Sequence, residues 1–249
     1  HNNHTFMLKP NWLVKLTWNY VYRWANYVTV LTDFDVDFFQ KKKVNVVVMP
    51  NPCSFPTLKT NAHEREKSLL AIGSLDRIHH KGFDNLIEIM SYVLPINPDW
   101  QLKIVGGGSE LNFEVLKQLI LDKKLEKQIS LLGYRNDINE LMQKASIYIL
   151  SSRFEGLPMV LLEAMSQGMA CVAYDCVTGP SNMITNDLNG ILVENQDKLK
   201  MKNEIIKLIQ DKKTCKRLGS EAIKSLDEYK TEVIYERWKK LIQSVTLQF

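Results

Sequence analysis

The chain has 249 residues, 45% of them hydrophobic and 24% charged, with a mean hydropathy of −0.19. This composition is typical of folded globular domains and excludes collagen-like, low-complexity and wholly disordered proteins. No apolar run reaches the ~18 residues of a membrane-spanning helix. The net charge of +4 lies entirely in the first 60 residues and the remainder is neutral, so attraction to an anionic partner is expected from that first quarter.

The beginning of the chain shows no secretory leader. The first residue is His1, and no charged-then-apolar segment follows it, so we expect a chain that is trimmed at its start or is a fragment. Residues 9–24 combine basic side chains with three of the five tryptophans. A basic, aromatic segment of this kind indicates contact with an anionic or membrane surface, and an ordinary solvated helix face fits the same residues equally well.

The first elements along the chain form an incomplete α/β unit. Helical patterns at residues 12–24 and 33–40 alternate with strand-like runs at residues 27–31 and 44–49. Two strands are too few to form a sheet that buries its helices. We therefore assign residues 1–50 to the remnant of an N-terminal α/β domain.

After a Pro-, Ser- and Thr-rich linker at residues 51–66, strands and helices alternate regularly. Short apolar runs predict strands that are buried on both faces of a parallel sheet. The strands are expected at residues 68–73, 102–105, 129–132, 147–150, 170–174 and 191–193, and the helices at residues 83–94, 111–124, 138–145, 160–167, 198–210, 214–226 and 232–245. This alternation predicts a doubly wound α/β domain at residues 67–228. We expect the C-terminal helix, residues 229–249, to pack back towards the N-terminal part.

Neither the cysteines nor the acidic and histidine runs indicate a metal site. The acidic run at residues 33–37 lacks the glycine and the final glutamate of a calcium loop. With Thr32 before it, the run fits a helix N-terminus better. His79 and His80 have no carboxylate or third histidine at ligand spacing. The cysteines are too few and too scattered for a disulfide framework, and we expect reduced, structural thiols at Cys53, Cys171, Cys176 and Cys215.

The segment at residues 153–163 carries two carboxylates and follows an apolar strand. Glu155 is expected in the strand-to-helix turn at the carboxyl edge of the sheet, where open α/β folds bind ligands. The amides of Gly156 and Leu157 would be free there to meet an anion. Glu163 lies further along the helix, and two carboxylates so spaced suit hydrogen bonds to two separate hydroxylated groups. The alternative, a helix cap at Glu155 and a solvated Glu163, fits the spacing equally well.

The segments after two further strands carry groups that could bind a phosphate. At residues 105–110 three glycines end a strand and open a helix, which would let the backbone and the helix dipole approach a phosphate. A plain tight turn fits this run as well. Arg77 and Lys81 lie in the loop after another strand, where paired cations can neutralise a diphosphate leaving group. The alternative for them is a solvated basic loop.

Together these strand ends resemble the donor-binding domain of glycosyltransferase family 4, whose members have the two-domain GT-B fold. The segment FEGLPMVLLEAMSQG contains the family's two glutamates separated by seven residues, and the KGF-D-LI segment, the glycine turn and the DCVTGPSNMI loop also match. The resemblance implies an α/β protein of GT-B type, with one complete Rossmann-like doubly wound parallel sheet domain plus the remnant of a second, acceptor-side domain. It also implies retaining transfer of a sugar, most often from a UDP-sugar, with no cofactor and no essential metal.

Carried over onto this sequence, the family's site places Glu155 and the amides of Gly156 and Leu157 at the hydroxyls of the donor sugar. Glu155 would be the catalytic residue. Glu163 would bind the ribose hydroxyls, and Lys81 would hold the diphosphate. These roles are implied by the resemblance alone.

The remaining substrate-binding positions that the resemblance implies are Gly73, Ser74, Arg77, Gly106, Gly108 and Tyr134. The glycines would let the backbone approach the donor, and Tyr134 lies where the family contacts the base. The family usually has an arginine at the position of Ser74, and we expect Arg77 to take its place. His1 falls about where the family has an acceptor-side histidine.

The sequence therefore predicts a hexosyltransferase of polysaccharide biosynthesis that is cytoplasmic and peripheral at the inner membrane face. It would transfer sugar from a UDP-sugar to a glycan or lipid-linked acceptor, without a nucleic acid partner. One alternative is a non-catalytic or complementing donor-binding subunit. A nucleotide-sugar epimerase ranks lowest, because it would need acid/base groups from the missing domain. Since that domain is reduced, we expect this chain to transfer little or no sugar alone.

Overall fold

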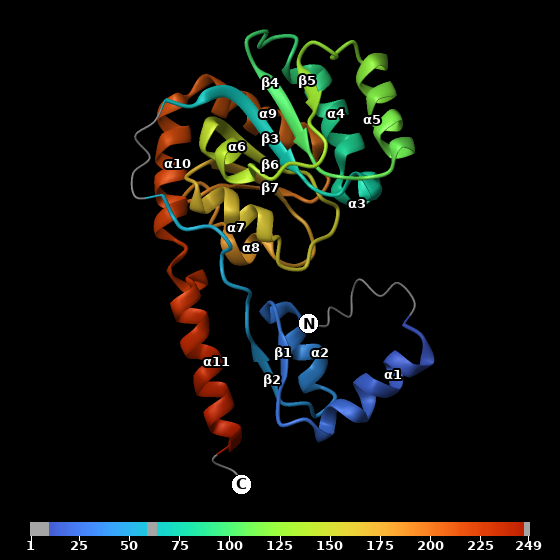
Figure 1. The fold of residues 1–249 in the computed structure, drawn as a ribbon, viewed down its shortest axis with the longest axis vertical. Helices are drawn as coiled ribbons and strands as arrows, with labels where there is room; N and C mark the ends of the chain where they lie inside the picture. The colour runs from blue at the N-terminus through green and yellow to red at the C-terminus, as the bar shows by residue number, and fades with distance from the viewer. Residues whose placement is uncertain (1–9, 59–63, 247–249) are drawn as a thin grey trace. The chain divides into compact units, whose positions relative to one another are not determined.

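The computed structural model describes residues 10–58 and 64–246, and in it the chain divides into two compact units. The larger unit is Ser54–Leu226, and the smaller one combines the chain up to Cys53 with the chain from Asp227 onwards (Figure 1). None of the helices within the described residues is long and apolar enough to cross a membrane.

The larger unit is built on six parallel strands in the order β5-β4-β3-β6-β7-β8. They are β3 (Glu66–Ile72), β4 (Gln101–Val105), β5 (Ile129–Leu131), β6 (Ala145–Leu150), β7 (Ala170–Asp175) and β8 (Ile191–Glu194). The order runs outwards in both directions from the central pair β3 and β6, as in a doubly wound sheet. This confirms the predicted α/β fold class, and it places the carboxyl ends of all six strands at one edge.

Helices cover both faces of this sheet. They are α3 (Ile78–Lys81), α4 (Phe83–Val93), α5 (Glu110–Asp122), α6 (Ile138–Lys144), α7 (Met159–Ser166), α8 (Pro180–Met183), α9 (Lys198–Gln210) and α10 (Lys212–Lys224). Leu86 of α4, Leu116 of α5 and Ile205 of α9 share one buried apolar core with Leu69 and Ile147 of the sheet. Figure 1 shows α6 and α7 on the other side of the sheet from α4 and α9. Burial on both faces explains why the strands are mostly apolar.

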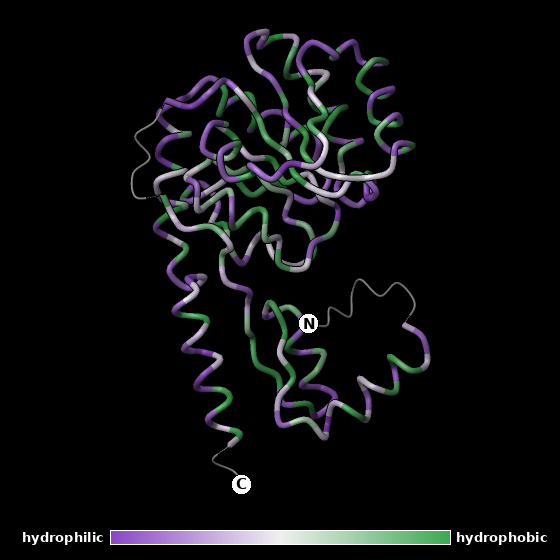
Figure 2. The backbone as a smooth tube through the Cα atoms, viewed as in Figure 1, coloured by the Kyte–Doolittle hydropathy of each residue, from purple (hydrophilic) through white to green (hydrophobic). Residues whose placement is uncertain are grey.

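The smaller unit has a parallel pair of short strands as its centre. Its elements are β1 (Val28–Val30), β2 (Val46–Val48), α1 (Trp12–Asn19), α2 (Val36–Gln40) and α11 (Thr231–Thr246). The two strands are hydrophobic (Figure 2), and the apolar core of this unit comprises Trp18, Val28, Val30, Phe39 and Val44. β2 itself is only half-buried, as expected for a sheet with so few strands. The prediction for His1 falls outside the described residues.

One helix of the smaller unit is shorter than predicted. The helix expected at residues 12–24 ends at Asn19, because Tyr20 leaves the helical region with φ −128°, and a 3-10 turn spans Val21–Trp24. The aromatic and β-branched residues that follow Asn19 are weak helix formers. By contrast, the predicted strands and helices of the larger unit have ends within two residues of the observed ones, although the short helices α3 and α8 were not predicted.

The acidic run near β1 also differs from its prediction. Its first turn, Asp33–Asp35, is a 3-10 turn, and α2 begins only at Val36. The acidic side chains do lie in a first turn, where the helix dipole favours them. Thr32 takes the N-cap position, as predicted, with an extended backbone, but its side chain makes no capping hydrogen bond.

Candidate functional site

Most of the candidate residues lie on the turns after three neighbouring strands, whereas Tyr134 follows β5 and Glu163 lies on α7. β4, β3 and β6 are adjacent and parallel, so the turns after them meet at the same edge of the sheet. The turn after β3 carries Ser74, Arg77 and Lys81, the turn after β4 carries Gly106 and Gly108, and the turn after β6 carries Glu155, Gly156 and Leu157.

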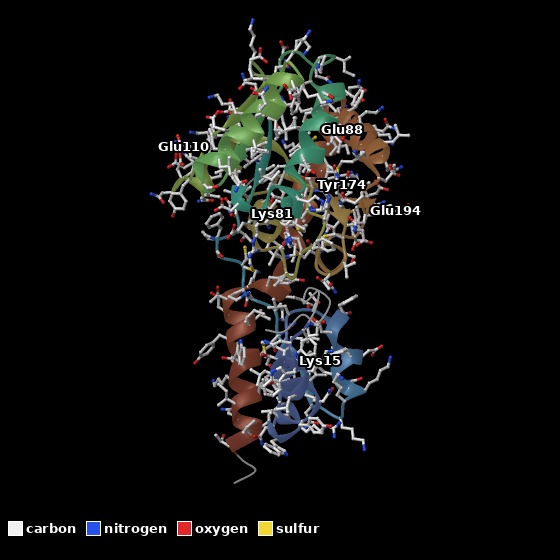
Figure 3. All side chains as sticks on the ribbon, turned by 90° about the vertical axis from the view of Figure 1, so that its right-hand side faces the viewer. Lys15, Lys81, Glu88, Glu110, Tyr174 and Glu194 are labelled. Carbon is white, nitrogen blue, oxygen red and sulfur yellow. The ribbon has the colours of Figure 1, made fainter. Side chains whose placement is uncertain are left out.

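An ion pair joins two of the predicted residues, Lys81 and Glu155. Lys81 Nζ (Lys81 is labelled in Figure 3) donates to Glu155 Oε1 at 2.8 Å, and Ser152 Oγ donates to the same oxygen at 2.6 Å. The two charged side chains are only 17% and 10% exposed. The alternative of Glu155 as a helix cap is wrong, because α7 begins four residues later, at Met159, and its start has no side-chain cap.

A sharp turn brings Lys81 against the end of β6. Gly82 has φ +68°, and a Cβ at this position would lie 2.0 Å from the carbonyl oxygen of Ser151. Ser151 Oγ also donates to the carbonyl oxygen of Lys81 at 2.9 Å. Only glycine combines this left-handed conformation with so close an approach, so Gly82 is required for the position of Lys81. The backbone of Glu155, the other member of the ion pair, is also held in place, because Thr178 Oγ1 donates to its carbonyl oxygen.

The glycine turn after β4 packs against the turn after β3. A Cβ at Gly106 would lie 1.8 Å from the carbonyl oxygen of Gly73, and the Gly73 amide donates to the carbonyl oxygen of Val105 at 2.9 Å. The close approach of two protein turns therefore accounts for glycine at position 106. A role of Gly106 and Gly108 towards a donor stays a prediction.

A carboxylate of the protein occupies the N-terminus of α5. Asp76 Oδ1 accepts hydrogen bonds from the Ser109 amide at 2.7 Å and from Asn112 Nδ2 at 2.9 Å. The Ser109 amide is the first cause that holds the pKa of Asp76 below its usual value. The helix dipole favours a negative charge at this point. The phosphate position suggested by the glycine run is thus filled from within the chain.

Four of the implied binding residues are exposed, Gly108 among them. Ser74 and Arg77 lie at the surface of the turn after β3, so the Arg77 guanidinium is accessible to a ligand. Tyr134 is 77% exposed, and a Cβ added at Gly107 would lie 3.8 Å from Cδ2 of its ring, in ordinary van der Waals contact. An exposed aromatic face beside a glycine turn can stack against a planar ring.

Glu163 lies on α7 in partly apolar surroundings. It is half-buried, and burial raises the pKa of Glu163, an effect that a hydrogen bond with Ser54 opposes. The segment around Ser54 stays attached to α7, because Gln167 Nε2 donates to the carbonyl oxygen of Pro56 at 2.9 Å. Glu163 is therefore not the freely solvated residue of the alternative interpretation.

The described residues contain no group of three or more His, Cys, Asp or Glu side chains that could hold a metal ion. All four cysteines are free thiols, as predicted. Burial raises the pKa of Cys176 to about 12. Such a thiol is unreactive.

Sequence reasoning missed four polar residues that shape this edge: Ser152, Arg153, Asp76 and Asp84. Each lies within five residues of a candidate residue, which was the only signal available. The sequence does not show the partners of Arg153, Asp84 and Asp76, because these partners are far away along the chain.

The chain is similar to enzymes of one family. The family model described as "Glycosyl transferases group 1" matches residues 58–225. An uncharacterized glycosyltransferase of Haemophilus influenzae is 30% identical over 217 residues, which are 86% of this chain and 60% of that relative. The poly(ribitol-phosphate) alpha-N-acetylglucosaminyltransferase of Staphylococcus aureus is 28% identical over 222 residues, 88% of this chain and 42% of that relative.

Solved structures agree with this similarity. A mutant of S. aureus TarM, in complex with fondaparinux, alpha-GlcNAc-glycerol and UDP, matches with a TM-score of 0.84 and 26% identity over 97% of this chain. The match covers 48% of the TarM chain. This chain therefore shares the fold of the matched part, and it spans only 42% to 60% of the length of these relatives.

Proposed function

The chain belongs to the group 1 glycosyl transferases, and we propose that its larger unit binds the nucleotide-activated donor of a retaining hexosyl transfer, as in glycosyltransferase family 4. The Lys81–Glu155 pair carries this proposal, since it holds a cation and a carboxylate 2.8 Å apart at the ligand-binding edge of a doubly wound sheet. A diphosphate requires cations, and sugar hydroxyls are good donors to a carboxylate. The UDP bound to TarM supports a UDP-sugar as the donor.

In the proposed reaction the bond between the anomeric carbon and the diphosphate oxygen breaks, and the electron pair leaves with UDP. Lys81 and the exposed Arg77 stabilise the negative charge that grows on the leaving group. Glu155 and the amides of Gly156 and Leu157 hold the sugar and orient its anomeric carbon. The acceptor hydroxyl oxygen forms its bond on the same face of the sugar, which is retention, and its proton passes to the leaving oxygen of the diphosphate. No essential metal is required in this scheme.

The nucleoside part of the donor is proposed to contact two other residues. Glu163 accepts hydrogen bonds from the ribose hydroxyls, which add to the hydrogen bond that its half-buried carboxylate has with Ser54. Tyr134 stacks on the base through its exposed ring.

The acceptor is proposed to be a hydroxyl-rich polymer, such as a glycan, a polyol phosphate or a lipid-linked glycan. The name of the S. aureus relative, which includes poly(ribitol-phosphate), supports this class. A complementing donor-binding subunit is the second candidate, because the smaller unit has only the strand pair β1 and β2 among its described residues. Such a subunit would need an acceptor half from elsewhere.

We further propose that the segment at residues 9–24 contacts the anionic inner face of a membrane. Within its described part, Trp12, Tyr20 and Trp24 are 69%, 61% and 86% exposed, and the charged side chains, Lys15 and Arg23, are both basic. Exposed aromatic rings with basic neighbours suit the interface of an anionic bilayer. Vesicle sedimentation tests this proposal. The chain should pellet with vesicles containing phosphatidylglycerol and not with pure phosphatidylcholine, and equal recovery from both would contradict it.

Calorimetry on the full chain tests the donor. We expect binding of UDP and UDP-hexoses, weaker binding of ADP, and weakened but measurable UDP binding in Lys81→Ala. Absence of nucleotide binding by the wild-type chain would refute the proposed function. Incubation of bound UDP-hexoses with and without a lipid-linked acceptor then separates the classes. Sugar transfer indicates the enzyme, an unchanged donor indicates the subunit, and an epimerised donor indicates the epimerase.

A further inference from the structure

Arg153 links the two turns that carry Lys81 and Glu155. It lies in the turn after β6, two residues before Glu155. Its backbone amide donates to the carbonyl oxygen of His80 at 2.9 Å, and its guanidinium donates to the carbonyl oxygen of His79. These bonds attach the turn just before Lys81 to the turn that contains Glu155.

The same guanidinium reaches the other side of Lys81 as well. Arg153 Nη1 lies 2.7 Å from Asp84 Oδ1, and Nη2 lies 2.9 Å from Asp84 Oδ2. Asp84 is in the first turn of α4, and the side chains of Arg153 and Asp84 are 15% and 33% exposed. A two-bond contact between a guanidinium and a carboxylate sets orientation as well as distance. Lys81 is therefore held between two points that are both fixed by one side chain.

We propose that Arg153 is a positioning residue of the donor site, which sets Lys81 Nζ beside Glu155 by holding His79, His80 and Asp84. This inference rests on the proposed function. Arg153 itself does not touch the donor, because its guanidinium is engaged by Asp84 and by the carbonyl oxygen of His79. In this respect it differs from Arg77, whose guanidinium is exposed.

The test compares UDP affinity in matched variants of the full chain. Asp84→Asn keeps the shape of the side chain and removes its charge. Glu88→Gln is the control, because Glu88 lies one turn further along α4 (Figure 3) and pairs with Lys198 Nζ at 2.6 Å. Both variants break an ion pair between α4 and another element, but only Asp84 is bonded to Arg153.

We expect Asp84→Asn to weaken UDP binding about tenfold, the loss of one charge-assisted hydrogen bond. Glu88→Gln should change it less than about twofold. In a Lys81→Ala background, Asp84→Asn should weaken UDP binding by less than about a further twofold, because an effect that acts through Lys81 disappears when Lys81 is removed. Hydrogen exchange gives a readout that needs no nucleotide. The backbone amide of Arg153 should exchange faster than in the wild type in Asp84→Asn, and at the wild-type rate in Glu88→Gln.

The proposal is overturned if Asp84→Asn leaves the exchange of the Arg153 amide unchanged, or weakens UDP binding equally with and without Lys81. If the wild-type chain binds no UDP, the proposed function fails together with the positioning role, whereas normal UDP binding in Asp84→Asn removes the positioning role alone. Should Asp84→Asn fail to fold, Arg153→Lys takes its place, since lysine keeps the charge and cannot form the two-bond contact.

Discussion

Replacing Glu155 with glutamine is expected to strengthen the binding of UDP and to weaken that of UDP-sugars. In the structure, Lys81 Nζ is held by Glu155 Oε1 at 2.8 Å, so a diphosphate has to compete with an internal carboxylate for the ammonium group. UDP carries no sugar and gains nothing from Glu155. A UDP-sugar loses the acceptor of its hydroxyl hydrogen bonds when the carboxylate is removed.

The electrostatics of the pair bound the size of this effect. Two unit charges at 2.8 Å interact by about 6 kcal/mol at an effective dielectric constant of about 20. Because both side chains are mostly buried, their desolvation offsets most of this energy. The net worth of the pair is then that of a charge-assisted hydrogen bond, about 1.5 kcal/mol. Ser152 keeps the new amide near Lys81, so we expect UDP affinity to rise about fivefold.

Calorimetry with UDP and one UDP-hexose measures both affinities in the wild type, in Glu155→Gln and in a control. The control is Glu66→Gln, because Glu66 accepts from Lys103 Nζ at 2.6 Å at the start of β3, the opposite end of the strand from the site. The control should bind both ligands as the wild type does. A UDP affinity that falls or stays the same in Glu155→Gln would show that Lys81 does not meet the diphosphate.

The fold of the larger unit was predictable because its strands are buried on both faces. Most of these strands contain a short, mostly apolar run, as at residues 147–150 in β6, and buried runs separated by helical patterns leave little choice of architecture. The smaller unit was less predictable. The break at Tyr20 and the 3-10 turn Asp33–Asp35 involve three or four residues each, too few for any periodicity to be visible in the sequence.

The sequence was sufficient to predict which residues belong to the candidate site, but not which contacts they make. Lys81 and Glu155 were found from their places at strand ends, but they are 74 positions apart, and their meeting depends on the left-handed Gly82 pressed onto Ser151. Asp76 shows the same limit. It stands beside the candidate cations in sequence, yet it binds the start of α5, 33 positions later. Such pairings follow from tertiary packing, which short-range patterns do not record.

Three further changes should separate stability from binding. Glu163→Gln should raise the melting temperature at pH 7, because burial raises the pKa of Glu163 and the ionised form is disfavoured in the fold. The same variant should bind UDP roughly tenfold or more weakly when measured by calorimetry. Burial works to raise the pKa of Asp84, but the hydrogen bond from Arg153 holds it below its ordinary value. The stability that Asp84 confers is therefore full above its unfolded pKa of about 4 and lost as the pH falls through the folded value, so the melting temperatures of the wild type and Asp84→Asn should converge in acid; a constant difference down to pH 2 would contradict this. Arg65→Ala should destabilise the larger unit without affecting the site. Burial lowers the pKa of Arg65 to about 10, so the guanidinium remains charged at pH 7, and it donates to carbonyl oxygens at the C-terminal ends of α6 and α7, those of Met142, Ala145 and Gln167. Alanine leaves these carbonyls without their charged donor, which should cost about 3 kcal/mol or more and lower the melting temperature by roughly 6–12 °C. Because these carbonyls lie at the opposite edge of the sheet from Lys81 and Glu155, UDP affinity at 15 °C should stay within about twofold of the wild type. An unchanged melting temperature, or a fall in UDP affinity of tenfold, would show that Arg65 does not act as this structural donor alone.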